Sequence, residues 1–188
     1  MRRCFSCLMI ILLPMASSAA DTQQAMLTEA QALADEFVAR LKPQLKNALQ
    51  TQGPAGAIAV CADVAPQLAD SLTYTSGWNV KRVSLKARNA SRAIPDAWET
   101  KHLQQFDSVA AKSNANEALE YGEVVGNRFR YLRAQTAEPV CLICHGRELS
   151  PEVAQAIKSY YPDDTAIGYD IGNVRGAISL SRRIDQPE

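Results

Sequence analysis

Histidine and methionine are scarce in this chain of 188 residues. His102 and His145 are the two histidines, and Met26 is the one methionine beyond the first twenty residues. Few side chains are therefore left to bind a metal ion. A zinc site built on the motif at 141–145 would need further Cys or His ligands, and only Cys61 and His102 remain.

The chain also lacks an excess of charge of either sign. Its 20 lysines and arginines balance 20 aspartates and glutamates. Residues 1–20 hold two arginines and no acid, so their removal leaves a formal charge of −2. A chain that is not basic gives no indication of binding to nucleic acid or to an anionic membrane surface.

The N-terminus has the pattern of a secretory signal peptide. Arg2 and Arg3 precede a short apolar run at 8–15, and small residues follow at 18–20. The run is shorter than the roughly 20 residues that span a bilayer, and no second long apolar run follows. We therefore expect a cleaved signal at 1–20, a periplasmic or otherwise exported protein and no integral membrane segment. An uncleaved anchor is the alternative.

Periodicity along the mature chain predicts an α+β fold with an antiparallel sheet. Helical spacing of apolar residues, then alternation, then turn signals succeed one another. Pro43 and Pro66 are expected to bend or break the helices that contain them. The domain division predicted is a signal at 1–20, an N-terminal helix at 21–52 and one domain at 53–188. The elements expected are helices at 22–50, 57–72, 98–109 and 151–160, and strands at 78–88, 118–125, 127–136 and 174–184.

The stretch Cys141-Leu-Ile-Cys144-His145 carries the strongest chemical signal. Two thiols separated by two residues can each form a thioether with one haem vinyl group, and the histidine that follows can bind the iron. The motif predicts one covalently attached haem c with His145 as an axial ligand. The other readings are a zinc site and a thioredoxin-like redox pair, but a strand-and-helix context for the latter is not seen.

The second axial position has four candidate occupants. Removal of the signal leaves three cysteines, so attachment of haem at Cys141 and Cys144 leaves Cys61 without a disulfide partner. His102 shares a helical face with Trp98 and Phe106, where a buried core role is also expected. Met26 fits an ordinary apolar contact. An open iron that binds a gas or peroxide is the fourth possibility.

Arginines are the candidate partners of the haem propionates, because a guanidinium pairs well with carboxylates. We single out Arg82, Arg128 and Arg175, although a solvated strand face would also explain them. The wider set of candidates adds Arg88, Arg130 and Arg133.

Several of these segments together resemble a family of exported c-type haem domains long known as a domain of unknown function. The segments, in order, are AIAVCADVAPQLA, VKRVSLKARN, PDAWE, CLICHG and YPDDTAIGYDIGNVRGAISL, and the resemblance runs from about Gly53 to Arg182. It implies a PAS-like fold, an antiparallel sheet flanked by helices. It also implies axial ligation by a cysteine of the early helix and by the motif histidine, here Cys61 and His145. The sequence Asn89-Ala90 departs from the Asn-Pro of relatives.

Three functions follow from this reading. Thiolate ligation lowers the reduction potential, which favours low-potential electron transfer with a redox partner protein. Loss of the thiolate on reduction would open a site for a small diatomic ligand, which favours a redox or gas sensor acting through a separate partner. A weak peroxidase would need an open iron and His102 as its acid–base group. We expect a protein that is not an enzyme.

Overall fold

The computed structural model describes residues 19–112 and 119–184. The predicted signal peptide lies outside this part of the chain except for its last two residues. Among the helices within these ranges, none combines the length and the apolarity needed to cross a membrane.

A long helix, α1, runs from Ala19 to Ala59 with a break near its C-terminal end. At Gly53 the backbone leaves helical geometry, with φ of 71° and ψ of 179°. Glycine tolerates this positive φ because it has no Cβ. The expected stop at Gly53-Pro54 is therefore a kink, after which the helix resumes. Pro43 lies inside α1, and Gly53 is the position in α1 where the backbone is not helical.

The helical path continues beyond α1 through a π-helical turn. The π segment spans Val60–Val64 and leads directly into α2, Ala65–Ser76. The Ala65 amide donates to the carbonyl of Val60, five residues earlier. Pro66 has no amide hydrogen to donate and its ring would crowd a regular helical turn, so the wider turn accommodates it. Pro66 thus changes the helix type rather than breaking the helix.

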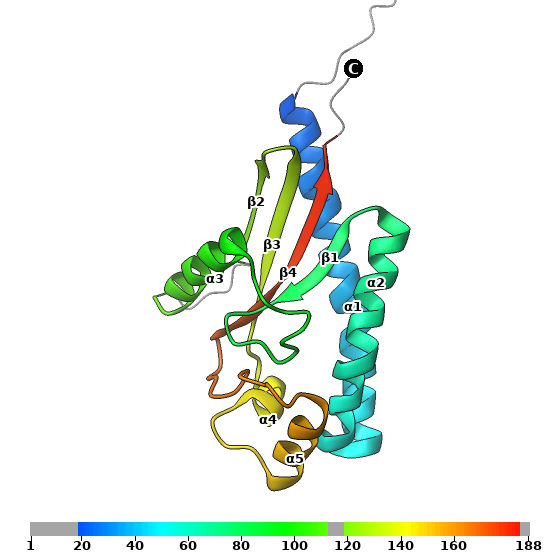
Figure 1. Cartoon of the computed structure of the whole chain (residues 1–188), viewed down its shortest axis with the longest axis vertical. Coiled ribbons are helices and arrows are strands. Elements are labelled where there is room, and N and C mark those ends of the chain that lie inside the picture. Colours follow the sequence, from blue (N-terminus) through cyan, green and yellow to red (C-terminus); the bar gives the residue numbers. More distant parts are fainter. Residues whose placement is uncertain (1–18, 113–118, 185–188) are drawn as a thin grey trace, which may run out of the picture.

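Four strands form one antiparallel sheet in the order β1-β4-β3-β2 (Figure 1). The strands are β1 Asn79–Val83, β2 Glu120–Val125, β3 Arg128–Thr136 and β4 Val174–Arg183. The predicted hairpin and the predicted last strand are present. Strand β1 is shorter than the expected 78–88, because the amide of Ser84 turns away to bond with Ala93. Leu85, which lies beyond the end of β1, is 42% exposed.

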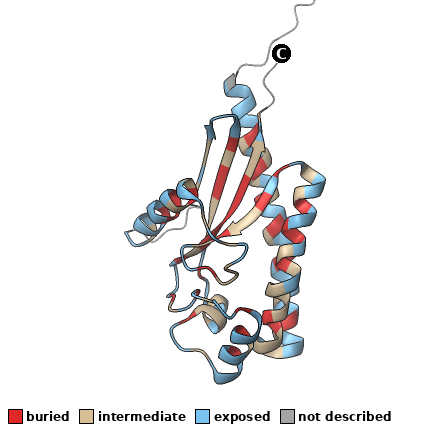
Figure 2. Cartoon of the chain, in the orientation of Figure 1, coloured by how far each residue is buried: buried red, intermediate tan, exposed pale blue. Residues whose placement is uncertain are grey.

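Helices cover both faces of the sheet. On one face α1 and α2 pack over an apolar cluster that includes Phe37, Leu72, Tyr131 and Ile178 (Figures 1 and 2). On the other face lies α3, Ala97–Ala110, which packs against β3 and β4. The N-terminal helix therefore shares one core with the sheet. These features confirm the expected α+β fold with an antiparallel sheet flanked by helices.

The remaining short elements gather at one end of the sheet (Figure 1). They are a 3-10 turn at Pro139–Cys141, α4 at Leu142–His145 and α5 at Pro151–Tyr160. Ser150 caps α5 by accepting a hydrogen bond from the amide of Val153, as its sequence predicts. Helix α5 packs against the C-terminal part of α1.

Glu99 is the most buried acid of the α3 face, with no exposed surface. Its carboxylate accepts hydrogen bonds from the Ser179 hydroxyl at 2.6 Å and from the Lys81 ammonium at 3.0 Å. It also accepts from the amide of Asp96, which completes the capping box of α3. One carboxylate therefore ties α3 to β1 and β4.

We expect Glu99→Ala to lower the free energy of unfolding by about 3 kcal/mol, because it leaves buried donors without an acceptor. Glu36→Ala is the matched control, since Glu36 forms an exposed pair with Arg40 and should cost less than about 0.5 kcal/mol. Chemical denaturation followed by circular dichroism measures both. Equal losses in the two variants would contradict the assigned role of Glu99.

Candidate functional site

The motif cysteines lie on a tight turn at the end of the sheet. Cys141 ends the 3-10 turn, and Cys144 lies in the single turn of α4. Both side chains are half-buried free thiols, as is that of Cys61. Burial raises the pKa of the Cys144 thiol, and the neighbouring Cys61 and Cys141 sulfurs add to the rise, although Arg88 opposes it. The structure therefore brings the helical segment around Cys61 close to the motif, because Ala62 and Cys144 pack against the same apolar cluster.

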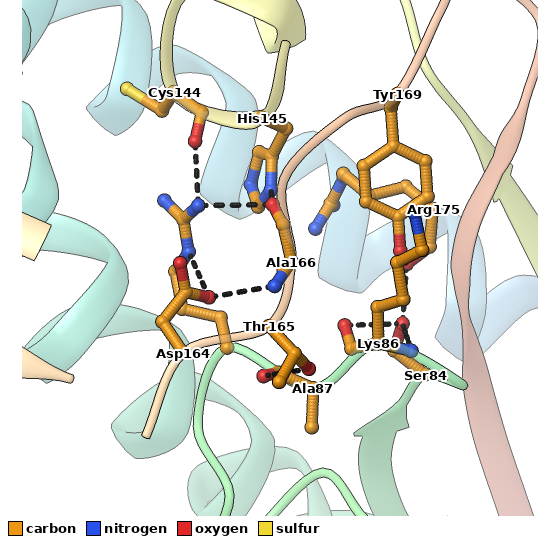
Figure 3. Close-up of polar contacts among 11 residues, drawn as sticks. Ser84, Lys86, Ala87, Cys144, His145, Asp164, Thr165, Ala166, Tyr169 and Arg175 are labelled. Atoms are coloured by element: carbon orange, nitrogen blue, oxygen red, sulfur yellow. Dashed lines mark hydrogen bonds and ion pairs between the residues drawn. The ribbon is translucent and has the colours of Figure 1, made fainter. Parts of the chain in front are cut away.

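His145 is held by the loop that follows α5. Its Nδ1 lies 2.7 Å from the carbonyl oxygen of Ala166, and its own carbonyl accepts from the amide of Tyr169 (Figure 3). A carbonyl can only accept, so Nδ1 carries the hydrogen and Nε2 keeps its lone pair. Burial lowers the pKa of His145 to about 2, and the nearby Arg175 and Arg88 reinforce this. The imidazole is thus neutral and oriented, as a metal-binding histidine must be.

Arg88 joins the motif to this loop. Its guanidinium donates to the carbonyls of Cys144 and Ala166, at 2.5 and 3.1 Å, and pairs with Asp164 at 3.1 Å (Figure 3). The Asp164 carboxylate also accepts from the amide of Ala166. Both side chains of the pair are largely buried. Arg88 therefore positions the segments on either side of His145 and has its hydrogen-bonding capacity largely occupied.

Arg82 and Arg175 supply further positive charge beside His145. Arg82 lies near the end of β1 and donates to the Gln135 amide oxygen at 3.1 Å. Burial and the nearby Arg175 lower the pKa of Arg82 to about 10, although Cys61, Tyr161 and Cys141 act in the opposite direction. Within 19–112 and 119–184, no acidic side chain forms an ion pair with Arg82 or Arg175. The site therefore has two uncompensated cations.

A β-bulge places Arg175. On β3 and β4, Gln135 pairs with Gly176 and Thr136 pairs with Val174, so Arg175 has no residue opposite it. An extra residue in one strand bends it locally and redirects the side chain, which is common next to functional sites. The bulge is consistent with an Arg175 side chain that reaches His145 rather than following the strand alternation.

Cys61 occupies the π-helical turn at 60–64. This turn carries Ala62 into an apolar cluster with Cys144, Ile58 and Tyr161. Cys61 is also among the groups that raise the pKa values of Arg82 and Tyr161. Single π turns inside helices frequently occur at functional sites, because they displace one residue from the regular helical face.

The other predicted site residues lie elsewhere. His102 is buried under α3, stacked on Tyr121 with ring centroids 4.3 Å apart. Met26 is buried in the α1 core, and Arg128 is exposed at the hairpin end of β3. The structure does not bring these three to the motif. Among the described residues, no group of three His, Cys, Asp or Glu side chains has a metal-binding arrangement.

The structure adds residues whose roles the sequence pattern did not indicate. Asp164 and Ala166 orient His145 and Arg88, and Tyr161 packs beside Cys144. All three lie in the segment from Tyr160 to Ile171, which has neither a helical nor a strand period. The sequence Pro162-Asp163-Asp164 predicts a turn. It gives no information on which distant side chains that turn contacts.

Comparison with known proteins agrees with this architecture. The crystal structure of the cyanobacterial heme-protein Tll0287 matches with a TM-score of 0.63 at 23% sequence identity, over 92% of this chain and 100% of that one. No curated protein matches significantly. The family model Tll0287-like matches residues 14–182, which is nearly the whole sequence. The matched range includes the π turn, the motif and the three arginines Arg82, Arg88 and Arg175. The chain therefore belongs to the Tll0287-like family.

Proposed function

We propose that this chain is an exported haem c protein that works in low-potential electron transfer. One haem is attached through Cys141 and Cys144, with His145 and Cys61 as axial ligands. The single observation that carries the proposal is that Ala62, next to Cys61 in the π turn, shares one apolar cluster with Cys144 of the motif, whose carbonyl accepts from Arg88. The Tll0287-like family and the fold shared with a heme-protein support a haem site.

The charges of the cluster suit a haem. A haem carries two propionates, and Arg82 and Arg175 are the two cations that lack acidic partners among the described residues. Isolated charges in a half-buried site are costly unless they are paired. Two propionates would neutralise both guanidinium groups through charge-assisted hydrogen bonds. Arg88 already pairs with Asp164, so it is the least suited of the three to this role.

The small apolar residues of the cluster also suit a flat macrocycle. Ala62 packs in the cluster beside Cys144, and Ala137 and Ala166 are buried in a second cluster beside Cys141. Short side chains allow close approach of a large planar group. The neutral His145, with Nδ1 engaged by Ala166, presents Nε2 as the ligand atom. The residues present therefore fit a covalently held haem.

The coordination sets the expected chemistry. When bound, haem iron supplies one-electron redox chemistry. An anionic sulfur stabilises the ferric state and lowers the reduction potential, whereas the nearby arginines raise it by a smaller amount. A low potential suits a carrier that receives and passes on single electrons with a partner protein. His102 is a buried residue of α3 and stacks on Tyr121, so we do not propose a peroxidase.

Ligation by Cys61 is tested with Cys61→Ser. Wild-type ferric protein should be low-spin with a thiolate charge-transfer band in its absorption spectrum, and the variant should lose that band, because the hydroxyl is a far weaker ligand. The variant should still retain its haem after acid–acetone extraction, since both motif thiols remain. Cys144→Ala provides the converse control, with weakened retention. An unchanged band in Cys61→Ser would contradict thiolate ligation, and loss of haem from wild type on extraction would contradict covalent attachment.

The propionate assignment is tested with Arg175→Gln. Loss of a positive charge beside the iron should lower the reduction potential, by an amount on the order of 1 kcal/mol, because reduction adds negative charge to the site. Arg128→Gln is the matched control: it removes the same charge from the exposed end of β3 and should leave the potential unchanged. Potentiometric titration measures both. Equal effects of the two variants would reject the assignment.

A haem-based sensor of redox state or of a diatomic gas is the second candidate. A surface cavity of about 400 Å³ is lined by Ala62 and Asp63, the residues that follow Cys61, together with Arg88 and Tyr161. It would give a small ligand access from solvent to a haem bound beside the π turn.

Carbon monoxide distinguishes the two functions. An electron carrier that keeps its thiolate should not bind CO after reduction with dithionite, because the iron stays six-coordinate. A sensor that releases Cys61 on reduction should bind CO and show a shifted Soret band. The absorption spectrum of reduced wild-type protein before and after CO decides between them, and Cys61→Ser, which lacks the sulfur, is the CO-binding positive control.

A further inference from the structure

Tyr169 is a buried tyrosine that is tied to the end of the motif. Its amide donates to the carbonyl of His145 at 3.0 Å, so the two residues are joined through the backbone. Tyr169 is 6% exposed and belongs to an apolar cluster with Ala166, against which Cys141 packs. The loop that follows α5 therefore places this side chain between a motif cysteine and the motif histidine.

The ring of Tyr169 contacts the imidazole of His145. The two ring centroids lie 6.2 Å apart and the ring planes are inclined at 76°, which is an edge-to-face arrangement. Among the aromatic side chains of the described segments, Tyr169 is the one whose ring pairs with His145. The loop thus holds the side chain of His145 as well as its backbone.

The Tyr169 ring is itself held from other sides. Its hydroxyl donates to the carbonyl of Arg175 at 3.4 Å, and the same carbonyl accepts from the Ser84 hydroxyl at 2.7 Å (Figure 3). The Lys86 ammonium lies 4.8 Å from the ring centroid and donates to the carbonyl of Ile167. A ring that is fixed in this way can restrain the group that it touches.

The hydrogen bond at Nδ1 does not determine the plane of the imidazole by itself. It joins one ring atom of His145 to the carbonyl of Ala166 at 2.7 Å. The second side-chain torsion of histidine has broad minima, so the ring can still tilt about that bond. A rigid side chain against the ring removes this freedom, and Tyr169 is in position to do so.

We propose that Tyr169 is a positioning residue whose ring fixes the plane of the His145 imidazole at the iron. This inference rests on the proposed axial ligation by His145. The plane of an axial imidazole decides which iron d orbitals it overlaps, so its orientation affects the electronic structure of the ferric haem. Tyr169 would thus give the site one defined ligand geometry instead of a range of tilts.

Tyr169→Leu and Tyr169→Phe test the inference on the full-length haem-loaded protein. Electron paramagnetic resonance of the ferric low-spin state reports the orientation of the axial ligand. Tyr169→Leu removes the ring, so the spread of the g values should change and the lines should broaden. Tyr169→Phe keeps the ring and loses only the hydroxyl, so its spectrum should match that of the wild type. If Tyr169→Leu does not load haem, Tyr169→Met takes its place with the same expectation.

Phe37→Leu is the matched control. It also replaces a fully buried aromatic side chain by leucine, but in the cluster beneath α1 and α2. It should lower the free energy of unfolding, as Tyr169→Leu does, and leave the g values unchanged. A spectral change of equal size in Phe37→Leu would show a general effect of lost stability, which overturns the proposal.

The outcomes separate this inference from the proposed ligation. If the ferric wild-type protein is high-spin, the iron lacks its pair of strong axial ligands, and both the proposed site and the inference fail. If it is low-spin but Tyr169→Leu, or Tyr169→Met in its place, has the wild-type spectrum, the ligation stands and the role of Tyr169 is wrong. A Tyr169→Phe spectrum that changes as much as that of Tyr169→Leu would also reject a role for the ring.

Discussion

The buried pair of Arg88 and Asp164 is the interaction on which the geometry of the site depends. It joins the connection after β1, the motif and the loop that follows α5. A buried ion pair is favourable only if its remaining hydrogen-bonding capacity is satisfied. Here two carbonyls, of Cys144 and Ala166, and the Ala166 amide meet that demand. Because Ala166 in turn orients the imidazole, the pair determines how His145 is presented.

The remaining charges make the site favour an anionic partner. Arg82 and Arg175 add positive charge that no acidic side chain of the described segments neutralises, and a β-bulge places one of them. Such an arrangement stabilises an anionic partner and destabilises the empty chain. The same arginines favour added electrons, while a cysteine ligand opposes them. The balance between these two influences, rather than either alone, would set the working potential of the protein.

Much of the fold was predictable because local signals coincided with tertiary contacts. Asp96 and Ser150 begin helices where their side chains can cap them, and the Gly126-Asn127 turn joins β2 to β3. The end of β1 was not predictable, since alternation continues past Val83 while the Ser84 amide bonds elsewhere. Pro66 was recognised as a breaker, but whether a helix ends, kinks or widens at such a residue depends on what the helix packs against.

The candidate site likewise combines residues that the sequence singled out with residues that it did not. The motif thiols and His145 could be proposed from the sequence because the spacing needed for haem attachment is set by local chemistry. Arg128 could not be separated from Arg82 and Arg175 by sequence, because the distinction lies in which end of a strand each occupies. The role of Asp164 depends on a partner 76 residues away, for which a single sequence holds no signal.

The two proposed ligands of the iron belong to layers that are far apart along the chain. Cys61 is part of the helical layer that packs on the sheet, and His145 is part of the short turns at its end. If each bound the same metal ion, the two bonds would cross-link the chain and close a loop. The loop would persist in the unfolded chain unless one of these bonds broke. By analogy with disulfides, a loop from residue 61 to 145 would contribute about 4.5 kcal/mol. Resistance to unfolding would then differ between the ferric and ferrous states, so that the stability of the fold would depend on whether the protein carries an electron.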